Sequence, residues 1–131
     1  MKRPRKKSTY TGAPACFALE LCCKQLTAAF GWGTGGLYVV GSALERPDWR
    51  DIDLRYILPD KEFARLFPDA GDHWEHDPRW LVLTVAISGW LRAQTGLPVD
   101  FQFQPQTQAN ERHKGLRNAV GLRFASKRVE A

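Results

Sequence analysis

Hydrophobic and polar positions follow two different periods along this chain, and the changes of period mark the expected elements. From Pro14 to Phe30, apolar side chains recur at helical spacing, which predicts a helix that Gly31 ends. Two short apolar runs, 37–40 and 51–58, predict strands. The first half of the chain is therefore expected to run helix, strand, strand.

Shorter elements are expected on either side of the chain's longest apolar run. Residues 60–67 can form a short helix between two prolines, with Asp60 as its N-cap. Residues 68–78 are expected to be a polar loop, and a final helix or coil is expected over 107–118.

The apolar run at 79–93 has the composition of a strand but is too long for one. We interpret it as a buried helix that begins at Pro78 and ends before Gly96. Trp80 and Trp90 are then expected to lie in the core.

A third strand is predicted at 99–104, where apolar and polar residues alternate. Val99, Phe101 and Phe103 would form its core face, and the opposite face would carry Asp100, Gln102 and Gln104. The order of elements predicts an α/β (α+β) fold, in which a small mixed β-sheet has helices packed on one face.

Length and composition are those of one globular domain: 131 residues, 44% hydrophobic and 25% charged. The net charge of +5 is unevenly distributed. We expect a basic disordered tail at 1–12, a core at 13–104 that is acidic overall, and a basic C-terminal extension at 105–131. Basic ends favour polyanionic partners such as nucleic acid, although they also suit a solvated tail.

Cysteine content and hydropathy indicate the compartment. The three cysteines, Cys16, Cys22 and Cys23, are clustered in one expected helix and do not form a disulfide framework. There is no signal-peptide pattern, and the longest apolar run is too short to span a bilayer. We expect a soluble, intracellular (cytoplasmic) protein without a membrane partner.

Candidate chemistry begins where the first strand ends. Gly41 and Ser42 can offer a backbone N–H and a hydroxyl to phosphate oxygens. Asp51 and Asp53 lie two positions apart in the next strand, so their carboxylates share a face and repel each other unless a cation lies between them. Hard oxygen ligands favour Mg²⁺, so this stretch predicts a phosphate and metal site.

Asp100 extends this motif to a third strand. If that strand lies beside the one carrying Asp51 and Asp53, three carboxylates converge. Such a trio can hold two divalent ions about 3.5–4 Å apart, the arrangement used for in-line phosphoryl transfer.

In this order, the three parts resemble the signature of the DNA polymerase β-like nucleotidyltransferase superfamily. By that resemblance, Gly41 and Ser42 would contact a triphosphate, and Asp51 and Asp53 would bind metal. Asp100 would complete the metal site and help deprotonate the acceptor.

The match lies within residues 37–104, about half of the chain, and is similar to minimal, phage-type members of that superfamily. It implies a minimal catalytic core that moves a nucleoside monophosphate from an NTP such as ATP to a hydroxyl group, with two Mg²⁺ ions. The resemblance does not supply the acceptor, for which the basic ends favour nucleic acid.

Each candidate residue also has a plainer interpretation. The aspartates can form ordinary ion pairs with Arg50 and Arg55 on an exposed strand face, and these arginines can equally contact phosphates. The segment from His73 to His76 suggests a metal pair but is better interpreted as polar loop. Trp49 is a candidate base-stacking residue.

Three other functions compete with nucleotidyl transfer. The first is a catalytically inactive nucleotide- or protein-binding module of the same fold. The second is a nucleic-acid-binding protein that acts through its basic ends. The third is a metal-dependent nuclease. Gly41 and Ser42 favour nucleotidyl transfer over hydrolytic cleavage.

Overall fold

The computed structural model describes residues 13–30, 35–41, 50–112 and 114–121, and all structural statements below concern these residues. The expected tail at 1–12, Ser42 and Trp49 lie outside them.

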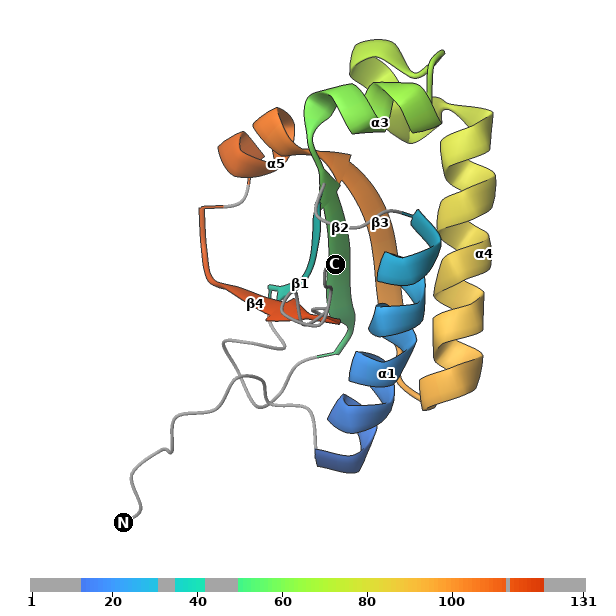
Figure 1. Ribbon diagram of the computed structural model, residues 1–131, viewed down its shortest axis with the longest axis vertical. Helices are drawn as coiled ribbons and strands as arrows, with labels where there is room; N and C mark the ends of the chain where they lie inside the picture. Colours follow the sequence, from blue (N-terminus) through green and yellow to red (C-terminus); the bar gives the residue numbers. More distant parts are fainter. Residues whose placement is uncertain (1–12, 31–34, 42–49, 113, 122–131) are drawn as a thin grey trace, which may run out of the picture.

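One four-stranded mixed sheet organises the chain (Figure 1). Its strands are β1 (Gly36–Val40), β2 (Ile52–Leu58), β3 (Val99–Pro105) and β4 (Arg117–Val120). Their order across the sheet is β3-β2-β1-β4. β1 is antiparallel to both of its neighbours, whereas β2 and β3 are parallel. The predicted α+β class with a small mixed sheet is confirmed.

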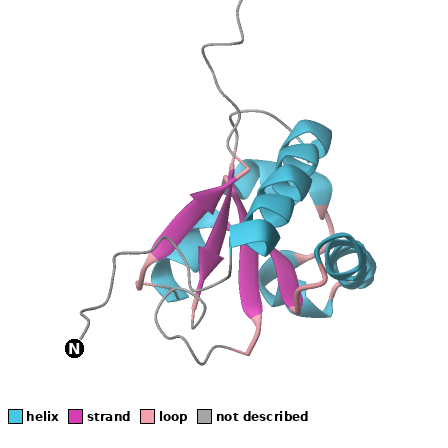
Figure 2. Cartoon of the chain, turned by 90° about the horizontal axis from the view of Figure 1, so that it is seen from below, coloured by secondary structure: helices cyan, strands magenta, loops and turns pink. Residues whose placement is uncertain are grey.

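Two long helices pack against the sheet on one side, as Figure 2 shows. They are α1 (Ala13–Phe30) and α4 (Pro78–Thr95). The shorter helices α3 (Asp60–Leu66) and α5 (Gln106–Arg112) lie near the end of the sheet where β2 and β3 finish, together with the 3₁₀ helix η1 (Gly71–His76).

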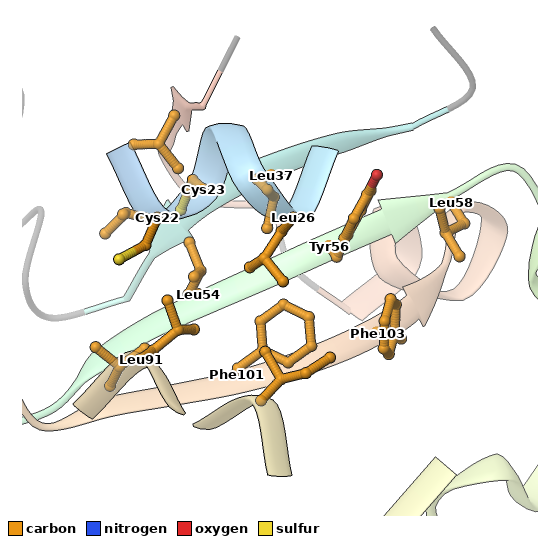
Figure 3. Packing of buried hydrophobic residues seen from close by; sticks show 14 of the residues in the cluster. Cys22, Cys23, Leu26, Leu37, Leu54, Tyr56, Leu58, Leu91, Phe101 and Phe103 are labelled. Atoms are coloured by element: carbon orange, nitrogen blue, oxygen red, sulfur yellow. The ribbon is translucent and has the colours of Figure 1, made fainter. Parts of the chain in front are cut away.

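Alternation in the strands separates a buried face from a polar one. Ile52 and Leu54 of β2 and Phe101 of β3 are fully buried against the helices. Figure 3 shows Leu26 of α1 and Leu91 of α4 in the same cluster. Residues in between these positions therefore point to the opposite face of the sheet, which is where the candidate site lies.

The boundaries of α4 are those expected from the sequence. The Asp77 carboxylate accepts a hydrogen bond from the Trp80 backbone N–H at 3.0 Å, and Pro78 occupies the first turn. Gly96 ends the helix with φ 72°, and its N–H donates to the Arg92 carbonyl.

The expectation that this helix is buried is wrong for one of its faces. Trp80 is buried, but Trp90 is partly exposed, and the side chains of Val82 and Val85 are each 67% exposed. A helix that lies on a sheet buries only one stripe of its surface, so an uninterrupted apolar run does not make every side chain part of the core.

Side chains of α4 also form hydrogen bonds with the outer edge of β3. The Trp80 indole Nε1 donates to the Phe103 carbonyl at 2.9 Å, and Arg92 Nε donates to the Val99 carbonyl at 2.9 Å. Between them, the Ser88 hydroxyl accepts from the Phe101 N–H at 3.0 Å. These side chains supply the hydrogen bonds that a neighbouring strand would otherwise provide to this edge.

The expected polar loop at 68–78 contains a 3₁₀ helix whose central residue belongs to the core. Trp74 is buried, and its Nε1 donates to Gln108 Oε1 at 2.7 Å. Arg112 lies over the Trp74 ring and pairs with Glu75 at 2.8 Å. This segment therefore joins α5 to the core. The sequence did not predict this role, because the residues around Trp74 are polar.

The final helix or coil expected over 107–118 is wrong at its end, where residues 117 and 118 belong to a strand. The helix α5 ends at Arg112, and β4 follows and pairs with β1. The sheet thus continues into the segment expected to be a C-terminal extension. β4 is short and has few apolar residues, so its sequence carries little strand signal.

The expected role of Asp60 as an N-cap is also wrong. Pro59 holds the N-cap position, and Asp60 is the first helical residue of α3. Its carboxylate instead accepts hydrogen bonds from the Thr107 hydroxyl at 2.6 Å and the Thr107 N–H at 3.0 Å. The two short helices are linked through this contact.

Among the described residues, no helix combines the length and the apolar content that crossing a membrane requires.

The link between Asp60 and Thr107 predicts a measurable pKa change. The hydroxyl of Thr107, and then its N–H, hold the pKa of Asp60 below its ordinary value. A carboxyl with a lowered pKa stabilises the fold above its unfolded pKa of about 4, and this contribution is lost as the pH falls through the folded value. In Thr107→Val, we expect an NMR titration to show the Asp60 pKa moving up toward its ordinary value. An unchanged pKa would contradict this role of the hydroxyl.

Gly121 predicts a stability effect at the end of β4. It has φ 65°, and a Cβ there would lie 2.5 Å from Cys23 Cβ in α1. Its N–H donates to Glu20 Oε2 at 2.8 Å, which keeps the backbone close to the helix. Gly121→Ala should lower the free energy of unfolding by more than about 1 kcal/mol in a denaturant titration.

The matched control is Gly89→Ala in α4, where an added Cβ meets nothing within 4 Å. That change should be neutral or stabilising, by up to about 1 kcal/mol. Equal effects of the two substitutions would show that Gly121 is not packed tightly against α1.

Candidate active site

The parallel pairing of β2 with β3 places Asp53 directly beside Asp100. Paired residues on neighbouring strands point to the same face, and strands lie about 4.8 Å apart. The third strand therefore lies beside the second, which is the condition on which the sequence pointed to converging carboxylates. Both side chains lie on the face opposite α1 and α4, where Asp53 is 31% and Asp100 is 44% exposed.

Gly41 brings the end of β1 to the same place. The last residue of β1, Val40, pairs with Asp53, and Gly41 follows with φ 78°. A Cβ on Gly41 would lie 2.5 Å from Asp53 Oδ2, so the backbone at this turn lies against the carboxylate. Ser42, the other residue expected to bind phosphate, lies outside the described residues.

Asp51 has a different position from the other two aspartates. It precedes β2, which begins at Ile52, and its side chain is exposed. Among the described residues, no three histidine, cysteine, aspartate or glutamate side chains form a group that could hold a metal ion. The structure thus brings Gly41, Asp53 and Asp100 together. Asp51 lies just before β2 and does not belong to this cluster.

Arg55 is the site residue that the sequence left undecided. Its Nη2 lies 3.7 Å from Asp53 Oδ1 and 3.4 Å from Asp100 Oδ2. Its Nη1 donates to the carbonyl oxygens of Asp100 at 2.7 Å and Leu54 at 3.2 Å. These ion pairs agree with the interpretation of Arg55 as an ordinary ion-pair partner of the aspartates. Its position two residues after Asp53 on a strand is the signal that places it on the same face.

The burial of Arg55 distinguishes this cluster from a surface ion pair. Its side chain is 9% exposed, far less than either aspartate. Its Nε is buried and has no hydrogen-bond partner. A buried, incompletely bonded charge carries a desolvation cost, so the cluster is not explained by stability alone.

The carboxylates fit a divalent cation by their chemistry. Two neighbouring, partly exposed carboxylates are the oxygen donors that Mg²⁺ takes from proteins, and water and phosphate oxygens complete its shell. Asp53 and Asp100 would hold such an ion, with Asp51 close along the chain.

Other candidate groups lie apart from this cluster. His73 and His76 belong to η1 with ring centroids 6.5 Å apart, and no third ligand joins them among the residues that the structure describes. A hollow of about 150 Å³ is lined by Leu58, Glu62 and other residues. It lies at the end of β2 opposite to Asp53, so it belongs to a different part of the molecule.

Gly41 allows a direct test of this geometry. In Gly41→Ala, the new methyl group should displace the Asp53 carboxylate, and we expect weaker binding of Mn²⁺, a spectroscopic substitute for Mg²⁺. Gly96→Ala is the matched control, because Gly96 has φ 72° but nothing lies within 4 Å of an added Cβ. Both substitutions should destabilise the fold, and only the first should weaken Mn²⁺ binding in an EPR titration. Equal Mn²⁺ affinities would contradict the contact between Gly41 and Asp53.

No protein-family model, curated protein or solved structure matches this chain. The resemblance in its motifs therefore stays a prediction, and the chemistry rests on the residues described above.

Proposed function

We propose that the protein is a Mg²⁺-dependent nucleotidyltransferase that moves a nucleoside monophosphate from an NTP to a hydroxyl acceptor. One observation carries this proposal. The separate parts of the motif, Gly41 after β1, Asp53 on β2 and Asp100 on β3, meet at one place on the polar face of the sheet. Residues with phosphate-binding and metal-binding chemistry are thus adjacent in space although they are far apart in the sequence.

Each residue has a role in this chemistry. Asp53 and Asp100 would hold Mg²⁺, which neutralises charge on the triphosphate when bound. The turn at Gly41 lets the nucleotide approach the backbone closely, and Ser42 would contact the triphosphate by the resemblance. Asp100 has the more exposed carboxylate and can accept the proton of the acceptor hydroxyl.

The transfer step balances without a further reactant. The acceptor oxygen forms a bond to the α-phosphorus. At the same time, the bond breaks between the α-phosphorus and the oxygen that links it to the β-phosphorus. Pyrophosphate leaves with the electron pair, and the hydroxyl proton passes to the Asp100 carboxylate. Arg55 offsets part of the negative charge of the two aspartates, which lessens their repulsion of anionic phosphate groups at this face.

A non-catalytic binding module is the second candidate, and one observation favours it. The Arg55 guanidinium is itself a counter-charge that partly neutralises both aspartates. Such a module would bind nucleotide at the same face without turnover.

The nucleic-acid-binding alternative depends largely on residues outside the described ranges. Its proposed basic segments are residues 1–7 and 112–128.

Transfer activity separates these candidates. The protein is incubated with each α-³²P-labelled NTP and Mg²⁺, with an oligonucleotide, a hydroxyl-containing small molecule or the protein itself as acceptor. We expect labelled product, and a loss of at least about hundredfold in Asp53→Asn and in Asp100→Asn. Asp72→Asn, a change in an exposed residue of η1, is the matched control and should retain activity.

The outcomes distinguish the two functions. Nucleotide binding without labelled product would favour the binding module. Transfer that survives both aspartate substitutions in folded protein, or no nucleotide binding in the unsubstituted protein, would overturn the proposal.

A further inference from the structure

We propose that the guanidinium of Arg55 takes the place of a second metal ion, so that this site binds one divalent cation per chain. The inference rests on the proposed function, because it concerns the metal that the aspartates would hold. It departs from the two-ion arrangement that the resemblance implies.

Arg55 is held independently of the two carboxylates. Its Nη1 donates to the carbonyl oxygen of Asp100 at 2.7 Å and to that of Leu54 at 3.2 Å. The Leu54 carbonyl belongs to the central strand β2 and the Asp100 carbonyl to its paired neighbour β3, so both are backbone groups that stay in place when the carboxylates change partner. The side chain is also 9% exposed, which leaves little room for it to swing into solvent.

The Arg55 guanidinium also takes up space beside both aspartates. One nitrogen, Nη2, lies 3.7 Å from Asp53 Oδ1 and 3.4 Å from Asp100 Oδ2. Two-metal sites place their ions about 3.5–4 Å apart around shared carboxylates. The guanidinium therefore occupies part of the volume in which a shared second ion would lie, and its charge repels that ion at short range.

Charge balance also favours a single ion. Asp53 and Asp100 carry two negative charges, and the Arg55 guanidinium offsets one of them. One divalent ion then gives these side chains a net charge of +1, whereas a second divalent ion would raise it to +3. The outer oxygens of the more exposed Asp100 remain accessible to that one ion.

The planar fork of arginine suits this position. Its two terminal nitrogens contact backbone carbonyls on one side and carboxylates on the other. A lysine has a single ammonium group and keeps the charge but not this bridging geometry. Arg55→Lys and Arg55→Met thus separate the effect of the charge from the effect of the side chain's bulk.

Mn²⁺ binding measured by EPR tests the inference without relying on activity. The unsubstituted protein, Arg55→Met and Arg55→Lys are titrated with Mn²⁺, and the bound ions per chain are counted. Two ions in one site are also magnetically coupled, which changes the spectrum from that of an isolated ion. Circular dichroism confirms that each variant is folded, and Arg55→Gln replaces Arg55→Met if the latter does not fold.

We expect one uncoupled ion per chain in the unsubstituted protein and in Arg55→Lys. In Arg55→Met or Arg55→Gln, we expect a second, coupled ion. Asp53→Asn should weaken Mn²⁺ binding at least tenfold in every background.

Three results would overturn the inference. Two coupled ions in the unsubstituted protein would show that Arg55 does not exclude the second ion, and this would leave the proposed nucleotidyl transfer intact. A single ion in a folded Arg55→Met or Arg55→Gln variant would show that another feature limits the number. If the unsubstituted protein binds no Mn²⁺ and transfers no label, the proposed function itself fails.

Discussion

The rest of this structure depends on the register between the parallel strands β2 and β3. This register places Asp53 opposite Asp100 on one face and leaves Phe101 fully buried on the other. A slip of one residue would turn a carboxylate toward α1 and α4 and expose an apolar side chain, which is costly on both faces. The packing of the core and the geometry of the site are therefore set by the same constraint.

The helix α4 maintains that register from the side. It connects the end of η1 to β3. The side chains of Trp80, Ser88 and Arg92 in this helix form hydrogen bonds with the backbone along the outer edge of β3. The residues of β3 that face the core are thus fixed by contacts with α4 and by pairing with β2. On the polar face, Arg55 links the two strands again through the Asp100 carbonyl. The hydrogen bonds of Arg55 to backbone carbonyls partly offset the cost of burying this charge.

The sequence predicted those elements whose periodicity is strong and local. The limits of α4 and the alternation in β3 could be expected from residue patterns. The proximity of Asp53 to Asp100 also required β2 and β3 to be neighbours, which the sequence offered only as a condition. β4 could not, because its pairing with β1 depends on a distant strand rather than on its own composition. Trp74 was missed because a single buried aromatic residue inside a polar segment has no periodicity. For Arg55, strand alternation predicts that its side chain shares a face of the sheet with Asp53. Whether it contacts phosphate or carboxylate depends on Asp100, which only the pairing of β2 with β3 brings close.

The contact between α1 and the turn after β4 has a consequence for the order of folding. The hydrogen bond from Gly121 to Glu20 joins residues 101 positions apart, whereas Asp53 and Asp100 are separated by less than half of that span. Closing a longer loop costs more chain entropy before any contact compensates for it. We therefore expect β2, α4 and β3 to assemble as an early nucleus and β4 to dock late. In that order, the carboxylates are already side by side while the far edge of the sheet is still open.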